Sequence, residues 1–166
     1  LNIHYKFYRM KNIWKTIDNF QFKEMSSCAN YLIQKNYEVS LWIQDISNRD
    51  KSTFLFNRKI NLARVSLNQL GFNSATKLKD VYQAYEKFGF KTVDPIIAIY
   101  TRLIYDEQPT GEWLRISVPL DSMIDSDGVP HLPKLGKGLG KLFIETYWSY
   151  PDAIFHPHNE FVVEIL

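Results

Sequence analysis

The spacing of apolar residues separates helical from extended segments in the first part of the chain. Between Met10 and Asn36, apolar residues recur at intervals of three and four, which predicts one bent helix or two short ones. The stretch Val39–Ile46 alternates and is rich in β-formers, which favours a strand. Thr53–Phe56 and Ile60–Leu67 are expected to form further strands. Helices followed by strands are therefore predicted for this part of the chain.

Two helices are predicted in the middle of the chain. The first is expected to start near Ser74 or Thr76, either of which can cap free amides, and to end at Gly89 in the left-handed conformation. The second starts at Asp94-Pro95, a cap followed by a proline at the first helical position. Its β-branched residues would also suit a strand, but the start signal favours a helix. Their apolar faces are Leu78, Val81, Tyr82, Tyr85 and Phe88, and Ile96, Ile99, Tyr100 and Leu103.

The C-terminal half alternates between apolar and polar residues, which predicts an antiparallel β-meander. Leu114–Leu120 alternates strictly, and Asp125–Gly128 has the composition of a tight turn. Val129–Leu135 and Leu139–Trp148 are expected to form a hairpin, and Glu160–Leu166 a last strand. The expected fold class is α+β, with N-terminal helices, a central helix pair and an antiparallel β-meander as the C-terminal half.

Composition places the chain among globular proteins. Of 166 residues, 45% are hydrophobic and 23% are charged, and the length suits a single domain over residues 1–166. Residues 1–9 precede a methionine and are expected to be a leader, an upstream start or an added remnant. No apolar run is long enough to cross a membrane, and no secretory signal is present. Because Cys28 is the only cysteine, we expect a buried, inert thiol and a cytoplasmic protein with no membrane partner.

Charge is unevenly distributed along the chain. Residues 1–93 contain 15 Lys and Arg against 7 Asp and Glu, whereas residues 94–166 contain 5 against 11. A basic half can attract nucleic acid, although scattered lysines on a solvated surface produce the same bias. Nucleic-acid binding is therefore an alternative that requires the basic residues to share one face: Lys11, Lys15, Arg49, Lys51, Arg58 and Lys59.

Two motifs in the last third of the chain suggest metal binding, and each has a simpler explanation. Asp125–Gly128 resembles part of a calcium loop but lacks the flanking acids of a complete one, so a hairpin-type turn is expected. His156 and His158 are spaced to chelate a metal if extended, with His131 or Asp152 as a third ligand, but no established metal-binding motif is present. We therefore expect no metal and no cofactor.

The glycine-rich run Pro133–Lys141 is a weak candidate for an anion site. Its glycine amides and flanking lysines could hold a phosphate, through Lys137, Gly138 and Lys141. A phosphate loop needs a helix directly after it, however, and a strand is predicted here. A flexible hairpin connection is the simpler interpretation.

Charged and hydrogen-bonding residues are concentrated in the turn between residues 102 and 115. Cations and carboxylates that converge near a helix end can bind a polar ligand or perform general acid–base chemistry. They can equally form an internal network that fixes the junction between helix and sheet. The candidate ligand-binding residues are Arg102, Tyr105, Asp106, Gln108, Glu112 and Arg115.

Part of this turn also resembles a known group of sequences. Residues 102–114 follow the pattern R-L-x-Y-x-x-Q-P-x-G-E-W-L and precede an Asp127-Gly128 turn, as in a family of small uncharacterised bacterial proteins that the chain resembles over roughly residues 60–166. The resemblance implies a shared fold and a cytoplasmic location, and it implies no activity. The motif positions are Arg102, Leu103, Tyr105, Gln108, Pro109, Gly111, Glu112, Trp113, Leu114, Asp127 and Gly128.

The sequence favours a binding or regulatory module whose partner is a protein or a small polar ligand held near the 102–115 turn. Tyr and Trp often anchor such contacts, and the candidates here are either surface anchors or core residues: Trp113, Tyr147, Trp148 and Tyr150. The alternative is an enzyme with Asp106 or Glu112 as base and Arg102 or Arg115 as anion holder. Nucleic-acid binding through the basic half is the second alternative.

Overall fold

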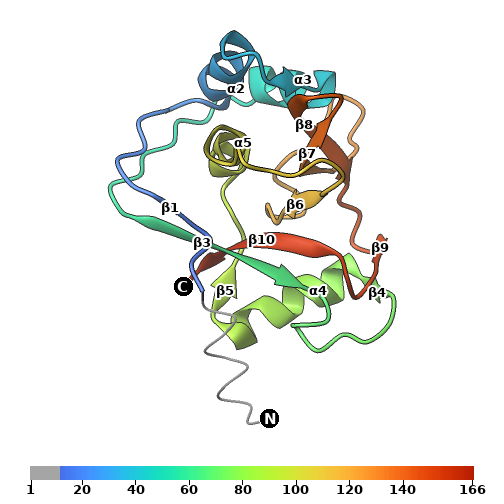
Figure 1. The fold of residues 1–166 in the computed structure, drawn as a ribbon. Helices are drawn as coiled ribbons and strands as arrows, with labels where there is room; N and C mark the ends of the chain where they lie inside the picture. The colour runs from blue at the N-terminus through green and yellow to red at the C-terminus, as the bar shows by residue number, and fades with distance from the viewer. Residues whose placement is uncertain (1–11) are drawn as a thin grey trace.

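A mixed β-sheet runs through the middle of the fold, with helices on both sides (Figure 1). The computed structural model describes residues 12–166. Its helices are α2 (Met25–Gln34), α3 (Leu41–Arg49), α4 (Leu78–Tyr85) with a 3-10 turn η1 (Glu86–Phe88), and α5 (Pro95–Ile104). Its strands are β1 (Lys15–Ile17), β2 (Glu38–Val39), β3 (Ile60–Ser66), β4 (Thr76–Lys77), β5 (Phe90–Lys91), β6 (Leu114–Ile116), β7 (His131–Gly138), β8 (Lys141–Trp148), β9 (Ile154–Phe155) and β10 (Glu160–Ile165). The predictions for residues 1–9, for Met10 and for Lys11 lie outside the described residues.

The sheet confirms the α+β class and changes the expected strand order. Its strands lie in the order β1-β3-β10-β6-β7-β8-β2, and β5 pairs with the end of β10. The meander prediction is confirmed for β6, β7 and β8, which pair antiparallel in sequence order. It is wrong for the last strand, because β10 lies between β3 and β6 and runs parallel to β6. The chain thus returns to the centre of the sheet after its outer hairpin.

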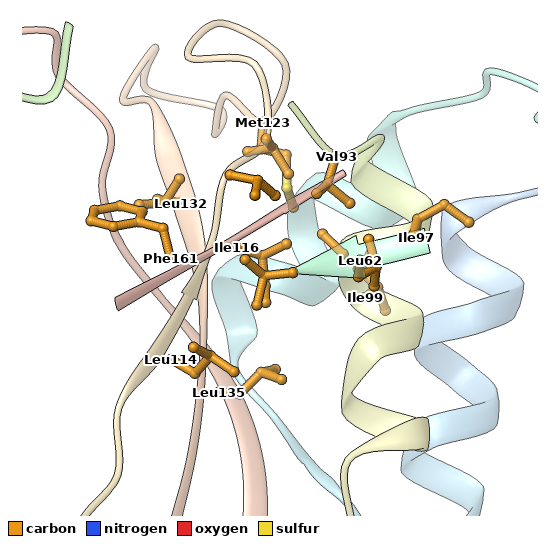
Figure 2. Packing of buried hydrophobic residues seen from close by; sticks show 14 of the residues in the cluster. Leu62, Val93, Ile97, Ile99, Leu114, Ile116, Met123, Leu132, Leu135 and Phe161 are labelled. Atoms are coloured by element: carbon orange, nitrogen blue, oxygen red, sulfur yellow. The ribbon is translucent and has the colours of Figure 1, made fainter. Parts of the chain in front are cut away.

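The core surrounds β10 and α5. Phe161 through Glu164 of β10 are all buried, so both faces of this strand are covered. In Figure 1, α5 lies on one side of the sheet with α2 and α3 beyond it, and α4 lies on the other side. Figure 2 shows side chains of β6, β7 and β10 in the same buried cluster as those of α5. Asp94 and Pro95 start α5 as predicted, and its first turns are buried on every side.

The predicted strand at residues 39–46 is wrong, because most of it forms α3. The Ser40 hydroxyl accepts a hydrogen bond from the Ile43 amide at 3.2 Å, which caps the helix. Ile43, Ile46 and Ser47 are buried, and this spacing places them on one helical face. Leu41, at the start of the helix, is 81% exposed.

The predicted N-terminal helix is only partly correct. Residues 25–34 form α2, with Cys28 buried on its apolar face as expected. Residues 15–17 instead form β1, which pairs with β3 so that Ile17 faces Ile60. Asn19 has a φ of 55°, which no helix interior adopts. The strand expected at Thr53–Phe56 does not form. In this segment the Phe56 ring packs against Phe20 and stacks with Phe54 instead.

The expected cap of the first central helix is wrong, because α4 starts at Leu78 after Lys77, no side chain caps it, and Thr76 lies in β4. Three other local predictions are correct in kind, although their boundaries shift. Gly89 ends the α4–η1 segment at a φ of 76°, in the left-handed region that suits glycine. The β7–β8 hairpin closes through Leu139 and Gly140, both with positive φ as a two-residue turn requires. The strand predicted to reach Leu120 ends at Ile116. Pro119, which has no amide to donate, lies in the irregular segment beyond it.

Candidate functional site

Arg102 and Gln108 of the predicted site lie inside the protein. The Arg102 guanidinium donates to the Gln108 side-chain oxygen at 2.6 Å and to the carbonyls of Gly136 and Phe143 at 3.2 and 3.1 Å. The Gln108 amide donates to the Leu135 carbonyl at 3.1 Å. Desolvation lowers the pKa of Arg102 to about 10, so it remains charged at neutral pH. These contacts tie the end of α5 to the β7–β8 hairpin.

Tyr105 and Glu112 point toward a second cluster, built around Arg64 of β3. Arg64 donates to Glu112 at 3.0 Å, to the Tyr105 hydroxyl at 3.0 Å and to Glu160 at 2.9 Å. The Tyr105 hydroxyl donates in turn to Glu112 at 2.6 Å. Burial and the hydrogen bond to Glu112 raise the pKa of Tyr105 to about 12. Trp14 packs edge-on against the Tyr105 ring, with 4.9 Å between ring centroids.

The last two predicted site residues lie apart from both clusters. Asp106 accepts a hydrogen bond from the Tyr37 hydroxyl. Arg115 lies over the Phe155 and Tyr147 rings, at 5.2 and 5.6 Å from their centroids, and burial lowers its pKa. Backbone contacts join the two clusters, because Arg102 also donates to the Tyr105 carbonyl and the Gln108 amide donates to the Glu112 carbonyl at 3.2 Å. The six residues are therefore engaged in contacts within the protein, as the alternative of an internal network expects. Their ligand-binding role stays a prediction.

The weak anion site is part of the β7–β8 hairpin. Lys137 pairs with Leu142 and Gly138 with Lys141, so a strand follows the glycines, as predicted, rather than a helix. The Lys141 ammonium lies 3.1 Å from a Glu38 carboxylate oxygen. Anion binding here stays a prediction.

Most of the basic residues considered for nucleic acid are close to carboxylates. Within residues 12–166, four of them form ion pairs on different elements: Lys15 with Glu107, Arg49 with Asp45, Arg58 with Glu164 and Lys59 with Asp18. These pairs reduce the positive charge free to meet a phosphate backbone. Nucleic-acid binding through this half stays an untested prediction.

A groove lies between α3 and the outer hairpin. It has a volume of about 620 Å³ and follows the side of β8 from Glu145 to Trp148. Trp42 of α3 lies on one side and is 46% exposed, and Trp148 of β8 is 62% exposed. The rest of the lining consists of Ser40, Asp125, Asp127, Val129, His131, Glu145, Thr146 and Tyr147.

A row of three hydrogen-bonded side chains forms the floor of this groove. His131 Nε2 lies 2.7 Å from Asp125 Oδ2, and His131 Nδ1 lies 2.8 Å from the Thr146 hydroxyl. The other Asp125 oxygen accepts hydrogen bonds from the amides of Asp127 and Val129, at 2.8 and 3.0 Å. The Trp42 ring stacks on the His131 ring, with 5.2 Å between centroids. The predicted 125–128 turn thus serves to hold a carboxylate against a histidine.

The chemistry of the row follows from the ionisation of Asp125. The hydrogen bond from His131 and those from the two amides lower the pKa of Asp125, against a smaller opposing effect of burial. An ionised carboxylate only accepts, so the hydrogen of a neutral His131 ring lies on Nε2. Nδ1 then accepts from the Thr146 hydroxyl. The order of hydroxyl, imidazole and carboxylate is that of an activated nucleophile with its base.

The groove is negatively charged and aromatic. Its lining contains the carboxylates of Asp125, Asp127 and Glu145, and none of the described residues that line it is Lys or Arg. Glu145 is paired with Lys134 at 3.1 Å, whereas no salt bridge within residues 12–166 involves the Asp127 carboxylate. A tryptophan face attracts cations, and a nearby carboxylate strengthens that attraction.

Sequence reasoning found part of this groove. The expected aromatic anchors are all at the surface, where Trp113, Tyr147, Trp148 and Tyr150 are 44%, 38%, 62% and 45% exposed. His131 was considered only as a metal ligand, and the part of the chain covered by residues 12–166 contains no group of three metal-ligating side chains. Trp42 was missed because α3 was predicted as a strand. A signal was present in Ser40, which can cap a helix as Ser74 can.

Comparison with known proteins identifies no relative: no protein-family model, curated protein or solved structure matches the chain. The resemblance noted from the 102–114 motif therefore stays a prediction. Across residues 12–166, no helix combines the length and apolar character needed to span a bilayer.

Proposed function

We propose that this chain is a binding module that holds a cation-bearing segment of a protein partner in the groove between α3 and β8. The observation that carries the proposal is the exposure of Trp42 and Trp148 beside Asp127, in a groove lined by carboxylates and by no described Lys or Arg. Exposed tryptophans supply much of the binding energy at protein interfaces, and a Lys or Arg side chain suits both their ring faces and the carboxylate. The cytoplasm remains the proposed compartment, in keeping with the free thiol of Cys28.

The test uses two synthetic peptides that differ only in charge. One alternates Lys with Val and Thr, and the other has Glu in place of Lys. We expect the Lys peptide to bind and to change tryptophan fluorescence, and we expect Trp42→Ala and Asp127→Asn each to weaken binding by about tenfold. Trp113→Ala is the matched control, because Trp113 is similarly exposed and lies outside the groove lining. Equal binding of both peptides, or binding that survives Trp42→Ala, would rule the proposal out.

A second candidate function is acyl transfer, favoured by the hydrogen-bonded order Thr146–His131–Asp125. In such a step the Thr146 oxygen bonds to the acyl carbon of an ester, and the bond from that carbon to the ester's alcohol oxygen breaks. The hydroxyl proton passes to His131 Nδ1 and from there to the departing alcohol oxygen. The His131 side chain is 3% exposed and its ring is covered by Trp42, so only the hydroxyl would meet a substrate. The test is incubation with 4-nitrophenyl acetate followed by mass spectrometry. Acyl transfer requires an acetyl group on Thr146 of the parent protein and no acetyl group on Thr146 of Asp125→Asn.

A further inference from the structure

Within residues 12–166, no strand pairs with part of the outer side of β8. β8 pairs with β7 over its whole length, from Lys141 to Trp148. On its other side β2 pairs only with Phe143 and Ile144, because the chain turns into α3 at Ser40. Among the described residues, the segment Glu145–Trp148, called here the open β8 edge, therefore pairs with β7 alone.

The register shows which backbone groups point outward from the open β8 edge. The Ser40 amide donates to the Ile144 carbonyl at 3.0 Å, so Ile144 directs its backbone polar groups away from β7. Hydrogen-bonding direction alternates along a strand, which gives Thr146 and Trp148 the same outward direction. The Ser149 amide, of the opposite parity, donates to the Pro130 carbonyl at 3.0 Å, at the start of β7. Outside the β7–β8 ladder, no hydrogen bond within residues 12–166 uses the backbone amides or carbonyls of Thr146 and Trp148.

The open β8 edge and the groove are the same place. The groove is lined by Glu145, Thr146, Tyr147 and Trp148 on one side and by Ser40 and Trp42 on the other. Natural proteins usually cover or shorten an unpaired edge, because it can template pairing with another chain. Here α3 stands beside the edge without covering it, since Trp42 and Trp148 remain exposed.

We propose that the partner segment binds in extended form and adds to β8 as a further strand. The inference rests on the proposed function and specifies its binding mode. The outward amide and carbonyl groups of Thr146 and Trp148 supply main-chain hydrogen bonds, and the flanking rings distinguish the side chains. Side chains on one face of the added strand meet Trp42 and Trp148. The occupant is a protein segment in which Lys or Arg alternates with β-formers, because the lining is acidic and aromatic.

Amide exchange and backbone methylation test the binding mode directly. In the free protein, we expect the Thr146 and Trp148 amides to exchange faster than the Tyr147 amide, and to become protected when the Lys-Val-Thr peptide is added. Methylating the peptide's backbone nitrogens one at a time should weaken binding about tenfold at alternate positions only. Suppose that Trp42→Ala abolishes peptide binding but methylation has no effect at any position of the peptide. That result would overturn strand addition and leave the proposed function intact. Absence of peptide binding would overturn both.

A matched pair of variants tests the protein side. Proline is tolerated on a strand edge whose amide points outward, so Thr146→Pro should fold. It should lack the backbone N–H that would donate to the added strand. Thr146→Val keeps the amide and removes only the hydroxyl, which makes it the control. We expect about tenfold weaker peptide binding for Thr146→Pro than for Thr146→Val, with both melting cooperatively. Equal affinities would overturn the inference. Sedimentation showing a dimer that only Thr146→Pro dissolves would also overturn it, because a second copy would then occupy the edge.

Discussion

Arg102 donates to the side-chain oxygen of Gln108 at 2.6 Å, and this pair lies inside the protein. The two residues come from the end of α5 and the turn after it, and both also bind backbone carbonyls of the outer hairpin. The Arg102 guanidinium and the Gln108 amide, which suggested a ligand site, thus hold β7 and β8 against α5. Since β8 forms one side of the groove, this buried pair positions the candidate site without contacting it.

Replacing Arg102 is expected to reduce stability strongly. Arg102→Met removes the hydrogen bonds that a charged group donates to the Gln108 oxygen and to the carbonyls of Gly136 and Phe143, and it should lower the free energy of unfolding by roughly 1–3 kcal/mol. Urea denaturation measures the loss. Lys59→Met is the control: its side chain is 62% exposed and its ammonium lies 4.0 Å from an Asp18 oxygen, so the stability lost should stay below about 1 kcal/mol. Similar losses for the two variants would contradict the structural role of Arg102.

The Tyr105 hydroxyl is expected to stabilise the cluster around Arg64. Tyr105→Phe removes one hydrogen bond to Glu112 and one from Arg64, and should cost roughly 1–3 kcal/mol. Because the partners touch, combining it with Glu112→Gln should cost less than the sum of the two single changes. Chemical denaturation of the four proteins completes the cycle. Additive losses would show that the hydroxyl and the carboxylate act independently.

Two glycines of β7 are expected to differ sharply in their tolerance of alanine. A Cβ at Gly136 would lie 2.4 Å from the Phe143 ring, whereas at Gly138 the nearest atom is 3.6 Å away. Gly136→Ala should therefore cost roughly 1–3 kcal/mol, and the additional change Phe143→Leu should restore part of it. Gly138→Ala should be close to neutral. Thermal melting separates the variants, and equal melting temperatures would contradict the close approach at Gly136.

Sequence features predicted the structure where their effect is local, and they failed where the structure depends on contacts between distant segments. Asp94-Pro95 starts α5 and Gly89 ends the preceding helical segment, because such signals act within one turn of backbone. The short α3 was missed because residues 39–46 fit both periods, and only the Ser40 cap separates them. The place of β10 could not be predicted, since pairing with β3 and β6 joins segments far apart in sequence.

The candidate groove was predicted only in its parts. Surface exposure of Tyr147 and Trp148 follows from their place near the end of an outer strand, which the hairpin prediction contained. The contact of Trp42 with His131 depends on how α3 packs beside β8, and composition carries no information about it. The open β8 edge follows from where β2 ends, which is a property of strand order. Local sequence patterns therefore predicted some of the residues that line the groove. Their arrangement depends on tertiary packing, which those patterns do not contain.

The free energy of unfolding is expected to fall at acid pH, because the Asp125 carboxylate becomes protonated there. The pKa of Asp125 is lowered in the folded protein, chiefly by the hydrogen bond from His131, relative to an ordinary value of about 3.9 in the unfolded chain. The folded state therefore favours the ionised form. The stabilisation is complete above the unfolded pKa and is lost as pH falls toward the lower folded pKa. Asp125→Asn should thus be less stable than the parent protein at neutral pH, and this difference should shrink below about pH 4.

Two further variants make the pH dependence specific to this carboxylate. Asp121→Asn changes an exposed carboxylate in the segment just before the turn, so its stability should follow that of the parent protein at every pH. Thr146→Val removes the hydrogen bond at the other ring nitrogen and keeps the Asp125 carboxylate, so it should still lose stability below about pH 4 as the parent protein does. Urea denaturation from neutral to acid pH measures all four proteins. A difference between Asp125→Asn and the parent that is constant with pH would show that the carboxylate charge does not stabilise the floor of the groove.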